Sequence, residues 1–252
     1  MLFNCQTKAV GQIFKQIARP LGFDYRRFAM KPAPAPGNPI VLSYLELRTV
    51  VGIVGIALPF VLALGMIVQG FHGLESSLSS YYYTDLRNVF VGSLCIIAAF
   101  LASCRGYDLR DEIAGWLAGA CAIGVAFFPT TPDGCATPEE KIIGYIHYTF
   151  AGILFLTLAY FCLFLFTQTH PDRKPTAQKL KRNSVYVVCG WIMLACIALM
   201  LLFIVPVISN LVHCSSRTFW LESTAIVAFG VAWLTKGEAI LKDKSAGPPR
   251  PQ

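Results

Sequence analysis

Five side chains that can ionise or hydrogen-bond lie near the ends of apolar stretches of the chain. Asp85 and Arg87 open one stretch, His147 and Glu222 each lie about one turn into another, and Tyr83 ends a run of three tyrosines. Ionisable groups at or inside a bilayer are costly, so they are functional candidates by default. These five residues predict a polar ligand-binding cluster in which Glu222 meets His147 or Arg87 beneath a tyrosine-rich loop.

Each residue also has a structural interpretation. A carboxylate at position 85 suits the free amides at a helix N-terminus, so Asp85 is expected to act as an N-cap. The tyrosines are typical of the aromatic belt at a membrane interface. His147 suits a hydrogen bond between helices. Glu222 is the hardest to explain structurally, because an apolar run follows it and a partner within the protein is expected.

A catalytic metal would need about three ligands around an open position. His147, His213 and Glu222 are the candidates, but the sequence has no His-x-x-x-His or Glu-x-x-His pair. It also lacks a Gly-x-Ser-x-Gly elbow, a phosphate loop and a dinucleotide fingerprint. We therefore expect no metal, no cofactor and a non-enzymatic role. The alternative is a metal-dependent intramembrane hydrolase acting on a lipid.

The composition of the chain is typical of a membrane protein. Hydrophobic residues make up 55% of the 252 positions and charged residues 14%, with a mean hydropathy of +0.57. An ordinary soluble domain is less apolar and more charged. The net charge of +7 is gathered in a few segments without interleaved aromatic residues, so nucleic acid is not an expected partner. The expected partners are membrane lipids, a small hydrophobic or polar ligand, or another membrane protein.

Six apolar segments satisfy the length needed to cross about 30 Å of hydrocarbon. The sequence therefore predicts an all-α bundle of six transmembrane helices. The third segment is the shortest, and we expect flanking residues to extend it. The predicted spans are 47–69, 86–104, 113–128, 143–166, 184–207 and 219–235.

The distribution of Lys and Arg supports six spans. When the sides of the membrane alternate, 18 of the 21 basic residues fall on one side, and the exceptions are Arg87, Lys141 and Arg217. Because cytoplasmic loops carry the basic excess, both termini are predicted to be cytoplasmic. Residues 1–44 are expected to form a basic tail with an amphipathic helix or disorder and a Pro-rich linker. Residues 45–238 form the membrane domain, and residues 239–252 form a disordered tail.

Two of the nine cysteines are predicted to lie outside the membrane. Cys135 falls in the loop between the third and fourth spans, and Cys214 in the loop between the fifth and sixth. An oxidising compartment would allow a disulfide between them, provided that the geometry fits. Both the paired and the free state are consistent with the sequence.

Several stretches of the membrane part resemble an uncharacterised group of bacterial six-helix integral membrane proteins. They are SSYYYTDLRNVFVG (79–92), RGY (105–107), AIGVAFFPT (122–130), FWLE (219–222) and AFGVAWLTKG (228–237). The resemblance implies a bacterial inner membrane location and draws attention to Asp85, Arg87 and Glu222 without giving them a role. Similarity to ceramidase-like membrane hydrolases is more distant, and the chain lacks the paired histidines that bind zinc in those enzymes.

Overall fold

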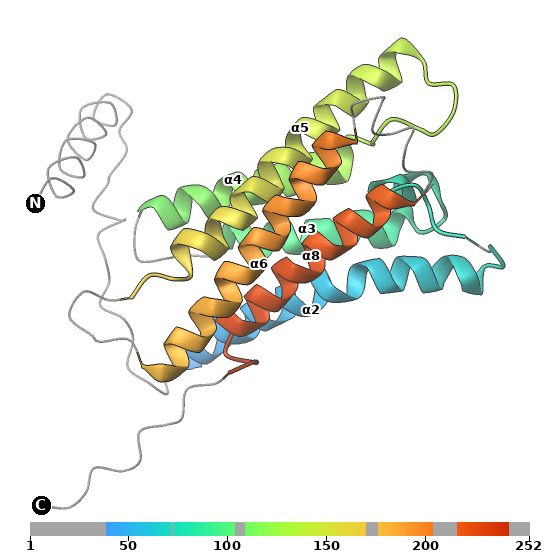
Figure 1. Cartoon of the computed structure of the whole chain (residues 1–252). Helices are drawn as coiled ribbons and strands as arrows, with labels where there is room; N and C mark the ends of the chain where they lie inside the picture. The colour runs from blue at the N-terminus through green and yellow to red at the C-terminus, as the bar shows by residue number, and fades with distance from the viewer. Residues whose placement is uncertain (1–38, 72, 104–108, 170–175, 204–215, 242–252) are drawn as a thin grey trace, which may run out of the picture.

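The computed structural model describes residues 39–71, 73–103, 109–169, 176–203 and 216–241 (Figure 1). Regular structure in these residues is helical throughout, which confirms the predicted all-α class. The α-helices are α2 (Pro39–Val68), α3 (Arg87–Ser103), α4 (Leu109–Phe127), α5 (Pro138–Tyr160), α6 (Ala177–Leu202) and α8 (Arg217–Lys236). A short 3₁₀ helix, η3 (Ser79–Tyr83), precedes α3, and a π-helical turn, η4 (Phe161–Leu165), continues α5.

In the described part of the chain, four helices are long and apolar enough to cross a membrane, namely 45–68, 138–165, 177–202 and 217–236. The chain is therefore a multi-pass membrane protein with four candidate spans. The other two helices differ from these in identifiable ways. Helix α3 is apolar but has only 17 residues, and α4 has 19 residues but opens with Arg110, Asp111 and Glu112.

The six α-helices pack as a ring in chain order. Each one contacts its sequence neighbour in the described part of the chain, and α8 closes the ring by packing against both α6 and α2. Figure 1 shows the helices running alternately up and down along a common direction. One end of the ring, which we call the basic end, holds the starts of α2, α4 and α6. The other end, which we call the opposite end, holds the starts of α3, α5 and α8.

Most helices begin earlier than the hydropathy pattern predicts. Helix α2 begins at Pro39, a residue well suited to a first turn because the amide it lacks would have no helical partner. Helix α5 begins at Pro138 behind a capping box, in which Thr137 and Glu140 each accept a backbone amide of the other. Helix α4 begins at Leu109, so the shortest predicted span is extended by flanking residues, as expected.

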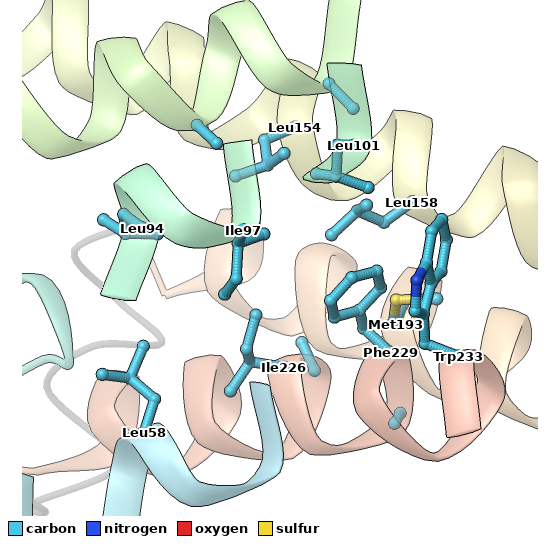
Figure 2. Packing of buried hydrophobic residues seen from close by; sticks show 14 of the residues in the cluster. Leu58, Leu94, Ile97, Leu101, Leu154, Leu158, Met193, Ile226, Phe229 and Trp233 are labelled. Carbon is cyan, nitrogen blue, oxygen red and sulfur yellow. The ribbon is translucent and has the colours of Figure 1, made fainter. Parts of the chain in front are cut away.

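Apolar side chains from several helices fill the centre of the ring (Figure 2). Ile97 and Leu101 of α3 lie close to Leu158 of α5 and to Phe229 and Trp233 of α8. Each of these five side chains is almost completely buried. The middle of the bundle is therefore a packed hydrocarbon core.

Glycines allow the closest helix contacts. A Cβ on Gly230 of α8 would lie 2.7 Å from the carbonyl oxygen of Gly52 of α2. A Cβ on Gly119 of α4 would lie 2.9 Å from the carbonyl oxygen of Ala98 of α3. Small residues at these crossings let two backbones approach closely, which is the usual way that membrane helices pack.

Candidate functional site

A segment between α2 and α3, residues 74–83, lies across the start of α8 at the opposite end, and we call it the strap. Ser216 Oγ donates a hydrogen bond to the carbonyl oxygen of Leu74 at 3.2 Å. The backbone amide of Phe219 donates to the carbonyl oxygen of Ser76 at 3.0 Å. The first amides of a helix lack partners within the helix, so the strap satisfies one of them from outside.

Glu222 fixes the other half of the strap. Its Oε2 accepts hydrogen bonds from the backbone amides of Leu78 at 2.7 Å and Ser79 at 3.3 Å, where η3 begins. The ring of Tyr81 packs beside that of Phe219, with ring centroids 6.0 Å apart. The partner expected for Glu222 is thus a pair of backbone amides, and its carboxylate caps a helix that belongs to another part of the chain.

Tyr83 joins the strap to the loop that follows α4. Its hydroxyl donates to the carbonyl oxygen of Thr130 at 2.5 Å, and Thr130 Oγ1 donates to Tyr148 Oη of α5 at 3.1 Å. Burial raises the pKa of the Tyr83 phenol, with a smaller contribution from the negative charge of Glu140. Tyr83 therefore acts as a hydrogen-bond donor between elements over the physiological range.

His147 is buried in α5 and bonds to the same loop. Its Nδ1 lies 2.6 Å from the carbonyl oxygen of Phe128. A carbonyl can only accept, so Nδ1 carries the proton in this contact. The neighbouring Gly144 makes room for the loop, because a Cβ there would lie 2.0 Å from Thr131 Oγ1. The histidine thus holds the loop after α4 against α5.

Asp85 and Arg87 are exposed to the surroundings at the start of α3. The guanidinium of Arg87 lies 4.0 Å from the ring centroid of Tyr82 and also donates to its hydroxyl. In the turn before α3, Thr84 Oγ1 accepts from the amide of Leu86 at 3.2 Å, and the N-capping role of Asp85 stays a prediction. Of the five predicted cluster residues, Asp85 and Arg87 are the two whose charged groups face outward.

The predicted contact of Glu222 with His147 or Arg87 is wrong for this structure. No hydrogen bond or ion pair joins those side chains in the described residues. The physical reason is the ring order, because α2 separates α3 from α8 and α6 separates α5 from α8 along most of their length. Glu222 and His147 bond instead to backbone groups of the nearest loops, and Arg87 bonds to the side chain of Tyr82.

Glu75 of the strap and Asp133 of the loop after α4 lie close enough for their negative charges to interact. Burial raises the pKa of Glu75 above its usual 4.5, and the negative charge of Asp133 raises it further. Like charges that approach on folding favour the protonated carboxyl. Protonation of Glu75 therefore stabilises this end of the folded protein.

Neither a metal site nor a disulfide is formed by the described residues. No group of three His, Cys, Asp or Glu side chains in them has the arrangement of a metal site. The thiol of Cys135 is exposed and free. Two of the predicted participants, His213 and Cys214, lie outside the described residues, as do most of the predicted N-terminal tail and most of the C-terminal one.

Comparison of the chain with protein-family models, curated proteins and solved structures finds no match. The resemblance to the uncharacterised bacterial group stays a prediction.

A second group of polar residues, which the sequence pattern does not single out, lies at the basic end. Lys179 and Arg182 at the start of α6 lie near Lys236 at the end of α8, and the ammonium groups of Lys179 and Lys236 lie next to Phe166. The available signal was the run Lys179, Lys181 and Arg182 close to a span. It was interpreted only as a determinant of topology, because basic residues at that position are expected for any cytoplasmic loop.

Proposed function

We propose that the chain is a six-span inner-membrane protein, with both termini in the cytoplasm, that binds a small lipid or solute or a membrane partner at its external end. In this proposal the opposite end of the ring is the external one. Asp85 and Arg87 contact the ligand, while Glu222, Tyr83 and His147 hold the surrounding strap and loop in place. The role is binding and not catalysis.

The positions of α3 and α4 support six spans. Both helices belong to the closed ring, and α4 packs against α3 and α5 along its length. Ile113, Trp116 and Phe127 of α4 are at least half exposed. An outward apolar face is typical of a helix that contacts lipid. By 1.5 Å per residue, α3 and α4 are about 25 and 28 Å long, close to the hydrocarbon thickness.

The packed core favours binding over conduction. A conducting path needs polar groups or water along its length. Here the middle of the ring is filled by side chains such as Leu101, Leu158 and Phe229. Recognition of a polar group would then take place at the helix ends.

The observation that carries the proposal is the outward-facing Arg87 on Tyr82. Its guanidinium lies over the aromatic ring, which orients it, and Tyr82 belongs to the strap, which bonds to α8 and to the loop after α4. A guanidinium that is positioned in this way offers donors in a fixed plane to a carboxylate, phosphate or carbonyl group. Asp85, two residues away, supplies a complementary acceptor.

Native mass spectrometry of the purified full chain tests this function. We expect wild-type protein to carry a copurifying small molecule or membrane protein that is lost in an Arg87→Ala, Asp85→Asn double variant. Asn88→Ala is the matched control, because Asn88 is exposed on the same turn. Retention of the same bound species by the double variant would refute the assignment of these two residues.

A further inference from the structure

Four basic side chains gather at the basic end, on three different helices. Arg48 comes from α2, Lys179 and Arg182 from the start of α6, and Lys236 from the last turn of α8. They are close enough in space for the charges of the other three to act on Lys236. We call these four residues the cationic cluster.

The π-helical turn at the end of α5 organises the cluster around Phe166. The amide of Phe166 bonds to the carbonyl oxygen of Phe161 at 2.8 Å, the i to i−5 pattern of a π-turn. The carbonyl oxygen of Phe166 accepts from Lys179 Nζ at 2.7 Å, and the ammonium of Lys236 lies 5.2 Å from the centroid of its ring. The ammonium groups of Lys179 and Lys236 therefore both lie next to Phe166. Such turns occur frequently at functional sites.

Three aromatic rings pack together next to these cations. The ring of Phe166 contacts those of Trp233 and Tyr186, with centroids 4.9 and 5.3 Å away. All three side chains are buried. The cluster therefore lies at the boundary between the apolar core of the ring and the polar end of the bundle.

Two carboxylates, those of Glu238 and Asp111, lie among the cations of the cluster. Glu238 pairs with Arg182, with Nη1 and Oε1 3.1 Å apart. Glu238 has a φ of 58°, a left-handed conformation that a residue other than glycine adopts only when its surroundings hold it there. Asp111 is an acidic residue whose charge acts on Lys236. Among the described residues, no ion pair joins the Lys236 ammonium to a carboxylate.

We propose that the cationic cluster binds a phosphate group, namely the headgroup phosphate of an anionic lipid, with Lys236 as a direct donor. Phosphate oxygens form strong, charge-assisted hydrogen bonds with Lys and Arg. Basic residues beside a span attract anionic headgroups at the depth where a helix such as α8 ends. This site lies at the end of the ring remote from Arg87, so it stands or falls independently of the proposed function.

Binding of short-chain lipids to the purified full chain tests the proposal. Dioctanoyl phosphatidylglycerol is titrated in detergent and followed by native mass spectrometry, with zwitterionic dioctanoyl phosphatidylcholine in parallel. We expect Lys236→Gln to weaken phosphatidylglycerol binding by about tenfold, as loss of one charge-assisted contact implies, and Lys236→Arg to retain it. Lys181→Gln is the matched control, because Lys181 is an exposed residue on the same turn as Arg182. It should change the affinity by less than about twofold.

Competition with inorganic phosphate distinguishes a lipid headgroup from a soluble phosphate as the ligand of this site. Displacement of the lipid by millimolar phosphate, dependent on Lys236, would assign the site to a soluble phosphate. Failure of phosphate to displace it would assign the site to the lipid, and both results retain a phosphate site. Equal losses with Lys236→Gln and Lys181→Gln would show nonspecific attraction and overturn the proposal. Equal affinity for the two lipids would also overturn it.

Discussion

Removal of the Glu222 carboxylate should release the strap from α8. The carboxylate accepts two backbone amides, at 2.7 and 3.3 Å, and hydrogen bonds to charged groups contribute about 1.5–3 kcal/mol each when well formed. The longer bond is weak, so we take about 2 kcal/mol for the pair. Glu222→Ala should therefore raise the population of the opened strap, and with it amide exchange, by about 30-fold. Glu222→Gln keeps one oxygen acceptor and should raise exchange by about fivefold.

Hydrogen exchange followed by mass spectrometry on peptides that cover residues 74–83 measures this effect directly. Thr224→Ala is the control, because Thr224 is an exposed residue close to Glu222 on α8. Exchange in α6 should stay unchanged in all three variants, which separates local opening from global unfolding. The reasoning is refuted if the Glu222→Ala strap exchanges at the wild-type rate while the protein stays folded.

Three further measurements test the packing, the electrostatics and the topology. Gly230→Ala should destabilise the protein by about 1–3 kcal/mol in a detergent unfolding titration, because its Cβ would lie 2.7 Å from a carbonyl oxygen of α2. Gly92→Ala, where nothing lies within 4 Å, should have little effect, and equal losses would contradict the packing. Because the pKa of Glu75 is raised by burial and by Asp133, its stabilising contribution is complete below pH 4.5 and is lost as the pH rises through the folded-state pKa. The melting temperature of wild type relative to Glu75→Gln should thus fall from pH 4 to 7, and a constant difference would exclude this effect. An impermeant maleimide added to intact cells should label the exposed, free Cys135 without prior reduction, whereas labelling only after permeabilisation would reverse the predicted topology.

The positions of the helices could be predicted from the sequence, because the bilayer imposes a length and a composition on each span. Helix starts were less predictable. Thr137 and Glu140 form a capping box, and Pro39 starts a helix, outside the apolar segments that hydropathy detects. Local capping, and not apolar transfer, decides where α2 and α5 begin.

The site was only partly predictable, for a different reason. The sequence places Glu222 and Arg87 correctly at the same end of the bundle, since that follows from counting spans. It cannot show which neighbours they meet, because this depends on the ring order and on the path of the strap. Backbone amides, such as those of Leu78 and Ser79, leave no mark in a residue pattern. The pairing of Glu222 with these amides could therefore be seen only in the structure.

Helix α8 links the two ends of the protein. Glu222 near its start holds the strap, and Lys236 in its last turn belongs to the cationic cluster, about 21 Å away along the helix at 1.5 Å per residue. Between them, Gly230 fits against Gly52 so closely that α8 has little freedom to slide along α2. Displacement of α8 along its axis would have to break the strap contact, the glycine contact and the Arg182–Glu238 ion pair together. The strap contact, the glycine contact and the ion pair therefore fix the position of α8 along its axis at three points, near its start, at its middle and at its end.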